Sequence, residues 1–507
     1  MKKCYHRFAR TRLIAALPCC AVFLIASAAA QQSASGLWLF SETRNDGSVL
    51  EIYHRLTQNG PHLEGTVLLA GEDLPIRNGI VTDNRLKFEV GPPENTWRCE
   101  GTLYGDNLEV TCQGSAPHAK PALVKFRRTS AEPFAVTERI EPPSLKELPV
   151  NGLAKTPPMG WNSWNHFAGQ IDDATVRAIA DAMVSNGMRD AGYQYINVDD
   201  TWEGQRDPKG ILRPNRKFPD MKALADYVHS KGLKLGIYSS PGPRTCANYE
   251  GSYGHEVQDA QMFAAWGIDY LKYDWCSAFR IYKDEEMRAV YQKMGEALQA
   301  SERPIVFSLC QYGKQEVWKW GALAGGNLWR TTDDIYDLWQ SMSTIGFSQA
   351  PLAPYAAPGH WNDPDMLEIG NGGLTIQESR THMSLWSMLA APLIAGNDLR
   401  SVPPDILSVL TNRDVIAIDQ DSLGKAATRA LAKGDIEVWT RPLSGGSTAI
   451  AVFNRGSRSE PLKIPWENLG ISRKAKVRDL WNHKDLMVDA SPVKVAAHDV
   501  VLLRTIP

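Results

Sequence analysis

The sequence predicts an α/β protein built around a (β/α)₈ barrel, with a small all-β domain before the barrel and an antiparallel β-sandwich domain after it. Eight short segments that resemble strands recur between residues 155 and 420, and segments with helical periodicity separate them. Alternating runs with regular turn signals occupy the two ends of the chain. Because strands that alternate with helices pair in parallel, eight such units predict a closed barrel.

Length and composition limit the class of protein. A chain of 507 residues is too long for one ordinary domain, and 43% hydrophobic with 22% charged residues is the balance of a folded protein. The 55 basic and 57 acidic residues give a formal charge of −2, without a Lys/Arg-rich patch. Nucleic acid is therefore not an expected partner.

Residues 1–30 have the features of a secretory signal peptide. Five basic residues precede an apolar run from Leu13 to Ala29, and small residues allow cleavage near Ala30. The sequence thus predicts export to the periplasm or outside the cell, and no other stretch is long and apolar enough to span a membrane. Cleavage would take away five basic and no acidic residues, so 50 basic residues would remain against 57 acidic ones.

Residues 31–130 are predicted to form the N-terminal all-β domain, whose role the sequence does not indicate. Leu86–Val90 alternates between apolar and polar residues, and turn signals such as Gly105-Asp106 separate runs of this kind. Cys99 and Cys112 flank that turn and would face each other across a hairpin. We therefore expect a disulfide between them.

Residues 131–154 are predicted to be a linker, since prolines are frequent there and no period is evident. The barrel is assigned to residues 155–420 and the C-terminal β domain to residues 421–507. The C-terminal strand signals are Ile436–Trp439, Ala449–Phe453, Lys474–Trp481 and Val500–Leu503.

The barrel strands are predicted from eight segments spaced along residues 155–420. They are Met159–Trp164, Tyr195–Asp200, Leu233–Ser240, Ile268–Asp274, Ile305–Gln311, Leu328–Asp334, His360–Asp365 and Leu393–Asp398. Helical spacing is seen between them, for example at Val176, Ile179 and Met183. An open doubly wound sheet is the alternative fold, but no Gly-rich phosphate-binding motif supports it.

The predicted strand ends carry the residues suited to chemistry, since active sites of such barrels gather at the C-terminal ends of the strands. These residues are Trp164, Asp199, Asp200, Asp274, Asp333, Asp334, Asp363 and Asp365, with Lys272 and Arg330 close by. Carboxylates accept hydrogen bonds from sugar hydroxyls, and indole rings cover the apolar face of a pyranose. The His residues include no pair at metal-ligand spacing, so we expect a carbohydrate ligand and neither a metal nor another cofactor.

Lys272, Asp274 and Cys276 alternate and would share one face of the fourth strand. An ammonium group beside Asp274 would favour the ionised carboxylate that a nucleophile requires. A glycosidase also needs a second carboxyl group to protonate the leaving oxygen. Spacing alone leaves the choice between Asp333 and Asp334 open.

These motifs together resemble the α-galactosidases of glycoside hydrolase family 27 over roughly residues 155–505. The motifs are PMGWNSW at 158–164, VDD at 198–200, LGIY at 235–238, YLKYD at 270–274, WRTTDDI at 329–335 and WNDPDM at 361–366. The resemblance implies the same barrel followed by an antiparallel β domain. The N-terminal β domain lies outside it.

The resemblance also implies roles for individual residues. Asp274 would be the nucleophile and Asp334 the acid/base of a retaining double displacement, with carboxyl groups about 5 to 5.5 Å apart. In substrate binding, Asp199 and Asp200 would accept from O4 and O6 of galactose, Lys272 would donate to O3 and O4, and Arg330 would hold O2 or O3. Trp164 and Tyr238 would form the wall of the pocket, and Asp365 and Met366 its edge.

The remaining cysteines and the choice of sugar are interpreted through the same resemblance. Cys246 and Cys276 match an active-site disulfide of the family, whereas Gly326 stands where the partner of Cys310 would be, which implies a free thiol. Gln311 and Tyr312 occupy the segment that contacts O2, and neither is small, which favours a 2-hydroxyl sugar over N-acetylgalactosamine.

Three alternatives to an exo-acting α-galactosidase remain. A β-L-arabinopyranosidase and an α-N-acetylgalactosaminidase would use the same scaffold, and the pair Asp199-Asp200 favours galactose because its O6 offers a partner. A non-catalytic carbohydrate-binding protein is the alternative from another class. The presence of both Asp274 and Asp334 argues against it.

Overall fold

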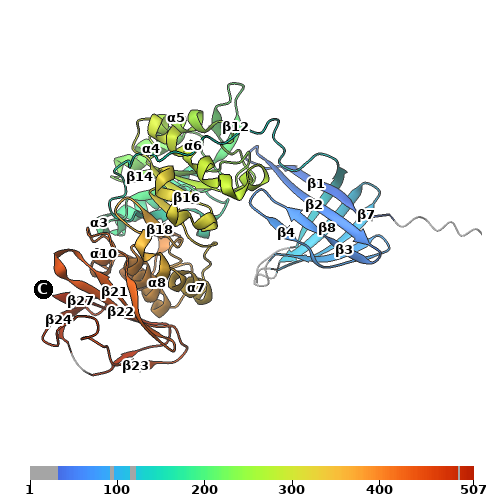
Figure 1. Ribbon diagram of the computed structural model, residues 1–507. Coiled ribbons are helices and arrows are strands. Elements are labelled where there is room, and N and C mark those ends of the chain that lie inside the picture. Colours follow the sequence, from blue (N-terminus) through green and yellow to red (C-terminus); the bar gives the residue numbers. More distant parts are fainter. Residues whose placement is uncertain (1–31, 92–95, 115–120, 489–490, 507) are drawn as a thin grey trace, which may run out of the picture.

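The computed structural model describes residues 32–91, 96–114, 121–488 and 491–506, and the predicted signal peptide lies outside them. Three parts follow one another along the chain (Figure 1). An N-terminal β-barrel lies at one end, a (β/α)₈ barrel lies in the middle, and a C-terminal β-sandwich lies at the far side of it.

The N-terminal part is a closed antiparallel barrel, which confirms the all-β prediction. Its strands are β1 (Gly36–Thr43), β2 (Val49–Asn59), β3 (His62–Leu68), β4 (Asp73–Pro75), β5 (Arg77–Thr82), β6 (Arg85–Val90), β7 (Trp97–Tyr104), β8 (Asn107–Gly114) and β9 (Ala122–Thr129). They pair in the order β2-β1-β9-β8-β7-β6-β5-β3-β4, and pairing of β2 with β3 closes the ring. Alternate side chains point inward, so Trp38, Leu86, Phe88, Leu103 and Leu108 form a separate core.

The expected disulfide of this barrel is present. Cys99 and Cys112 are directly opposite each other in the β7–β8 hairpin and are bonded. From Ser130 to Pro158 the chain then forms neither helix nor strand and runs along the central barrel. The N–H of Leu148, for example, donates to the carbonyl of Leu323.

The central part confirms all eight predicted barrel strands. They are β10 (Met159–Asn162), β11 (Tyr195–Asn197), β14 (Lys234–Ser239), β15 (Tyr270–Asp274), β16 (Val306–Cys310), β17 (Leu328–Arg330), β18 (Trp361–Asp363) and β19 (Leu393–Ala395). Neighbours pair in parallel in the order β18-β17-β16-β15-β14-β11-β10-β19. A parallel bridge between Leu367 and Ala395 joins the two ends of the series. A small hairpin, β12 (Glu203–Arg206) and β13 (Leu212–Pro214), follows β11.

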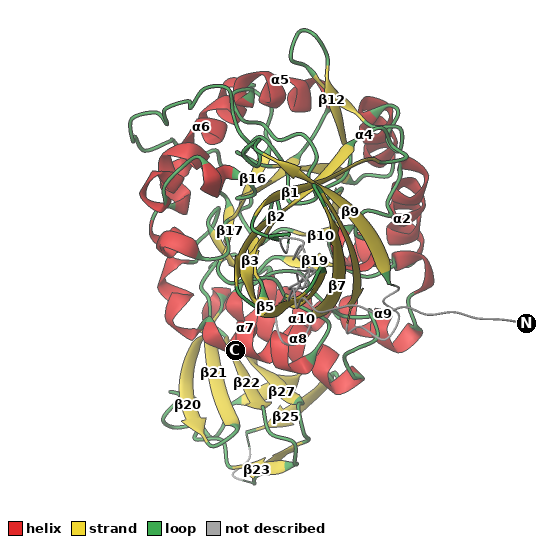
Figure 2. Cartoon of the chain, turned by 90° about the vertical axis from the view of Figure 1, so that its right-hand side faces the viewer, coloured by secondary structure: helices red, strands yellow, loops and turns green. Residues whose placement is uncertain are grey.

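Helices surround these strands (Figure 2). They are α1 (Trp164–Phe167), α2 (Asp173–Ser185), α3 (Met188–Ala191), α4 (Met221–Ser230), α5 (Glu256–Trp266), α6 (Met287–Ala300), α7 (Trp339–Ser348), α8 (Ile376–Leu389), α9 (Pro404–Leu410) and α10 (Arg413–Asp419). In α2, Asp172 accepts from the N–H of Thr175 and starts the helix, and Val176 and Ile179 are buried as their spacing predicts. No described helix is long and apolar enough to cross a membrane.

The C-terminal part is the predicted β-sandwich. Its strands are β20 (Thr428–Lys433), β21 (Ile436–Pro442), β22 (Thr448–Asn454), β23 (Glu460–Leu462), β24 (Lys476–Asp479), β25 (Lys484–Met487), β26 (Val493–Val495) and β27 (Val500–Ile506). Six of them pair in the order β20-β21-β22-β27-β24-β25, and β23 pairs with β26. One face of the larger sheet packs on the central barrel, so Trp439, Phe453 and Leu502 belong to the same core as the barrel residues.

The N-terminal barrel lies in front of the C-terminal ends of the parallel strands (Figure 2). The turn between β1 and β2 meets the segment that follows β14. Arg44 donates to the carbonyl of Ala247 over 2.7 Å, and Tyr249 donates to Asp46 over 2.7 Å. The end of the central barrel where an active site is expected thus faces another part of the chain.

Candidate active site

A cavity of about 530 Å³ opens at the C-terminal ends of the parallel strands. Eleven of the thirteen residues predicted for the site line it. They are Trp164, Asp199, Asp200, Tyr238, Cys246, Lys272, Asp274, Arg330, Asp334, Asp365 and Met366. The other two, Cys276 and Gln311, are fully buried beside it. The amide of Gln311 donates to the carbonyl of Arg330 over 3.2 Å, and its neighbour Tyr312 lines the cavity instead.

Asp274 is the last residue of β15, and both of its carboxylate oxygens are held by phenol groups. Tyr312 donates to Oδ1 over 2.7 Å, and Tyr238 donates to Oδ2 over 3.2 Å. The side chain is buried, with the residue 5% exposed. Burial raises the pKa of Asp274 above its ordinary value, although Lys272 and the bond from Tyr312 act in the opposite direction. The arrangement fixes the direction of the carboxylate towards the cavity.

The close ion pair of Lys272 is with Asp199 and not with Asp274. Its ammonium lies 2.8 Å from Oδ2 of Asp199, and Asn162 donates to the same oxygen over 2.7 Å. The charge of Lys272 still lowers the pKa of Asp274, as the alternation along β15 predicts, but burial outweighs it. Lys272 and Asp199 therefore present a donor and an acceptor side by side on the cavity wall.

Asp200 is held by backbone donors from two segments. The N–H groups of Thr201 and Ala247 donate to it over 2.7 Å each. Burial nevertheless raises the pKa of Asp200 to about 6, because loss of solvent disfavours the charged carboxylate. Its carboxyl oxygens thus face the cavity from a fixed position.

Arg330 ends β17 and connects two acidic residues. Its Nη2 lies 3.0 Å from Asp334 and 2.9 Å from Asp365, and the guanidinium is almost fully buried. Asp334 itself is 55% exposed at the side chain, so it stands at the open end of the cavity. Asp365 has φ of 87° and Tyr312 has φ of 60°, both in the left-handed region that costs about 1–3 kcal/mol for such residues. Two residues that line this cavity are thus held in strained backbone conformations.

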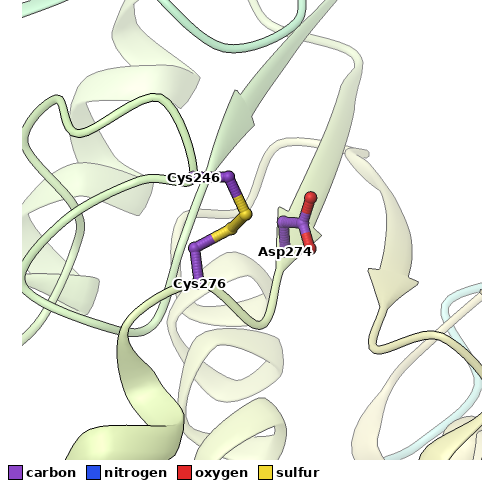
Figure 3. Close-up of side chains that lie close together, drawn as sticks. All are labelled: Cys246, Asp274 and Cys276. Atoms are coloured by element: carbon purple, nitrogen blue, oxygen red, sulfur yellow. A yellow bond between two sulfur atoms is a disulfide. The ribbon is translucent and has the colours of Figure 1, made fainter. Parts of the chain in front are cut away.

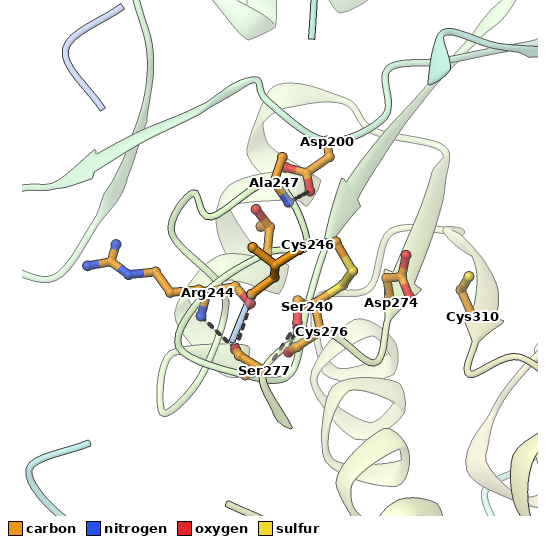
Figure 4. The surroundings of a disulfide bond; sticks show 12 residues. Asp200, Ser240, Arg244, Cys246, Ala247, Asp274, Cys276, Ser277 and Cys310 are labelled. Carbon is orange, nitrogen blue, oxygen red and sulfur yellow. Dashed lines mark hydrogen bonds between the residues drawn. A yellow bond between two sulfur atoms is a disulfide. The ribbon is translucent and has the colours of Figure 1, made fainter. Parts of the chain in front are cut away.

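The second predicted disulfide joins Cys246 and Cys276 (Figure 4). Ser240 donates to the carbonyl of Cys276 over 2.7 Å, and the hydroxyl of Tyr238 lies 3.3 Å from its sulfur. The bond therefore ties the segment after β14 to the segment after β15, next to Tyr238. Cys310 is a buried free thiol, as its missing partner predicts.

Among the described residues, one group of His, Cys, Asp and Glu has ligand atoms close enough to hold a metal. It consists of Cys246, Asp274 and Cys276 (Figure 3). The two sulfurs are joined to each other. A metal needs deprotonated thiolates as ligands, and a disulfide offers none.

Several residues that line the cavity were not predicted from the sequence. Asn165 and Asn371 both donate to Glu368, the second over 2.6 Å, and all three line the cavity. Burial raises the pKa of Glu368 to about 7. Glu368 lies beyond the end of β18, in a segment without strand or helix periodicity. Its position three residues after Asp365 in the sequence is the one feature that could have indicated it.

Comparisons with known proteins identify the family to which the central barrel and the sandwich belong. The family model for "Alpha galactosidase A" matches residues 156–421, and that for "Alpha galactosidase C-terminal beta sandwich domain" matches residues 433–505. The chain is 45% identical over 381 residues to alpha-galactosidase A of Cellvibrio japonicus, which covers 70% of this chain and 93% of that protein. It is 48% identical over 367 residues to the alpha-galactosidase of Cyamopsis tetragonoloba, and this match covers 71% of this chain and 87% of that protein.

A solved structure shows the same architecture. The crystal structure of alpha-galactosidase I from Mortierella vinacea matches with a TM-score of 0.68 and 34% identity, over 70% of this chain and 98% of that one. Neither family match includes the N-terminal barrel. The matches over the barrel and the sandwich show that the chain belongs to glycoside hydrolase family 27, the α-galactosidase family.

Proposed function

We propose that this chain hydrolyses terminal α-D-galactosyl residues by double displacement, with Asp274 as nucleophile and Asp334 as acid/base. The observation that carries the proposal is the contrast between the two carboxyl groups. Asp274 is buried and fixed by Tyr238 and Tyr312, whereas Asp334 is half-exposed and, among the described residues, is held only by Arg330 on one oxygen. A nucleophile requires a fixed direction, and a group that exchanges protons with water requires access to water.

The first half of the reaction forms a glycosyl-enzyme. An oxygen of Asp274 attacks the anomeric carbon, the bond to the leaving oxygen breaks, and the proton of Asp334 passes to that oxygen. In the second half, Asp334 takes a proton from water, the water oxygen attacks the anomeric carbon, and the ester bond to Asp274 breaks. The product keeps the configuration of the substrate.

The cavity wall offers hydrogen-bonding groups for the galactosyl hydroxyls. Lys272 and Asp199 lie together and suit a donor and acceptor pair at O3 and O4, while Asp200 suits O6. The guanidinium of Arg330 lies beside Asp334 and suits a hydroxyl near the reacting carbon. Trp164 and Met366 supply apolar surface for the ring.

The catalytic roles are tested by Asp274→Asn and Asp334→Asn, with Asp333→Asn as the matched control. Each substitution removes one charge and keeps the size of the side chain. We expect p-nitrophenyl α-D-galactoside turnover to fall by several orders of magnitude in Asp274→Asn and to stay near the wild-type rate in Asp333→Asn. For a retaining enzyme, NMR of the reaction is expected to show α-galactose as the anomer that is released first. Full activity of Asp274→Asn, or release of β-galactose first, would refute the proposal.

Residues of the same cavity wall favour galactose over related sugars. Tyr312 is bulky and lines the cavity next to Asp274, which leaves little room for a 2-acetamido group. Asp200 gives the C6 hydroxyl of galactose a partner that an arabinopyranoside lacks. Hydrolysis rates on p-nitrophenyl α-D-galactoside and p-nitrophenyl β-L-arabinopyranoside test this. Faster hydrolysis of the arabinopyranoside would overturn the preference for galactose.

We also propose that the chain is exported after cleavage near Ala30. The basic and apolar pattern of residues 1–30 and the two disulfides support it, because disulfides persist in oxidising compartments. The mass of the protein recovered outside the cytoplasm is expected to correspond to a chain starting at Gln31.

A further inference from the structure

A turn of the N-terminal barrel lies at the edge of the catalytic cavity. It joins β3 to β4, and the N–H of Leu69 donates to the carbonyl of Glu72 over 2.9 Å to close it. The N–H of Ser277, which follows the active-site disulfide, donates to the carbonyl of Ala70 over 2.6 Å. The tip of the turn is therefore bound to the segment after β15.

Two further contacts fix the position of this turn. Arg280 donates to the carbonyl of Leu69 over 2.6 Å and forms an ion pair with Asp73 at 2.5 Å. Gly71 lies against the disulfide so closely that a Cβ on it would be 3.0 Å from Sγ of Cys246, a residue that lines the cavity. A side chain at this position would force the turn or the disulfide to shift by a few tenths of an ångström.

The N-terminal barrel is also held at a second place, at Ala247, the residue that follows Cys246. Arg44 binds the carbonyl of Ala247, while the N–H of Ala247 donates to Asp200 in the cavity. The segment between Arg44 and Asp46 lines a neighbouring cavity of about 810 Å³ that shares Trp164 with the catalytic cavity. Two attachments prevent the barrel from swinging freely over the site.

Glu72 follows Gly71 in this turn, directly after the contact with Cys246 on the cavity wall. Its side chain is exposed, and within the described part of the chain no hydrogen bond or ion pair holds it. Desolvation raises the pKa of Glu72, and the negative charges of Asp334 and Asp333 raise it further. Asp334 protonates the leaving oxygen, so the leaving group lies on the side of the cavity where Asp334 stands.

We propose that the N-terminal barrel forms part of the leaving-group site and that Glu72 accepts hydrogen bonds from hydroxyls of the sugar from which galactose is cleaved. The inference rests on the proposed function and deepens it, since it assigns a hydroxyl-rich leaving group to the substrate. Carboxylate oxygens accept from sugar hydroxyls, and an unpaired acceptor at a fixed turn can bind one without rearrangement. Glu72 is a specificity residue in this account and takes no part in the bond changes.

The experiment compares two substrates on the full chain. Melibiose has a sugar as leaving group, whereas p-nitrophenyl α-D-galactoside has a planar ring with no hydroxyl at that place. In Glu72→Ala we expect KM for melibiose to rise about tenfold with kcat changed less than about twofold, because a charged acceptor is lost from binding. KM for the aryl galactoside should stay within about twofold of wild type.

Glu72→Gln keeps a neutral acceptor and should give an intermediate KM for melibiose. Glu64→Ala removes an exposed carboxylate from β3 of the same barrel and serves as the matched control, with both substrates unchanged. Wild-type kinetics of Glu72→Ala on both substrates, or an equal loss on both, would overturn the inference and leave the proposed function standing. A wild-type protein inactive on both substrates would overturn the proposed function and this inference with it.

Discussion

At the scale of single residues, Tyr312 has the most direct effect on the proposed nucleophile. Its hydroxyl donates to Asp274 over 2.7 Å and lowers the pKa of that carboxyl against the effect of burial. In Tyr312→Phe we expect kcat/KM to fall by about 10- to 100-fold, since a hydrogen bond to a charged group contributes about 1.5–3 kcal/mol. Steady-state rates on an aryl galactoside measure this.

The same substitution should also change the pH profile. Asp274 acts when ionised, so activity rises with pH through the pKa of Asp274, and loss of the bond from Tyr312 raises that pKa. The acid limb of the kcat/KM profile is therefore expected to move to higher pH. Tyr104→Phe, on the exposed surface of the N-terminal barrel, is the control. An unchanged acid limb would show that the bond does not influence Asp274.

The residues that sequence could predict are those with a position in a repeating pattern. Asp199 and Asp274 each follow or end an apolar strand, so parallel pairing brings them to one edge. Glu72 and Glu368 have no such position, because one comes from another barrel and the other from an irregular segment. Their approach to the cavity depends on how separate parts of the chain pack, and that is not encoded in local periodicity.

At the scale of elements, the parallel strands were predictable because their burial on both faces makes their sequences mostly apolar. Leu309 of β16 and Leu393 of β19 are fully buried, for example. The strand lengths were less predictable, since β17 ends at Arg330, before the predicted end at Asp334. Asp334 is therefore on a loop beyond the strand, which agrees with its exposure.

The segment that runs from β18 towards α8 contains buried carboxyl groups whose ionisation should affect stability. Burial raises the pKa of Asp363 to about 6 and that of Glu368 to about 7. A carboxyl whose pKa is raised on folding stabilises the folded state below its unfolded pKa and loses this contribution as the pH rises through the folded pKa. For Glu368 the loss falls between about pH 4.5 and pH 7.

Glu368→Gln removes this titration. Between pH 5 and pH 8, the free energy of unfolding of the wild type is expected to fall relative to that of Glu368→Gln by roughly 2–3 kcal/mol. Urea unfolding of both proteins at the two pH values measures the difference. Glu147→Gln, an exposed site outside the helices and strands, should show no such pH-dependent difference. A constant difference for Glu368→Gln would contradict the raised pKa.

At the scale of the whole molecule, the hydrophobic cores divide the chain differently from its three visible parts. The C-terminal sandwich has a smaller core of its own, around Val438 and Val452. It also shares a larger core with the central barrel, in which Trp439 and Phe453 of the sandwich pack on α7 through Phe347. Arg441 of β21 is fully buried and donates to the carbonyls of Ser387 and Asp419 in the central barrel. The N-terminal barrel has its own core and meets the rest through its turns and through residues of β2 and β4.

This division predicts two transitions in a calorimetric scan, one for the N-terminal barrel and one for the barrel and sandwich together. The disulfide Cys99–Cys112 spans 13 residues, and its loss in a double Cys→Ala variant should lower the stability of the smaller transition alone by about 3 kcal/mol. Arg441→Met should lower only the larger one, because buried carbonyl acceptors lose their donor. If both substitutions shift one common transition, the turn contacts at Arg44 and Arg280 couple the two cores. In that case the N-terminal barrel is part of a single cooperative unit with the active site.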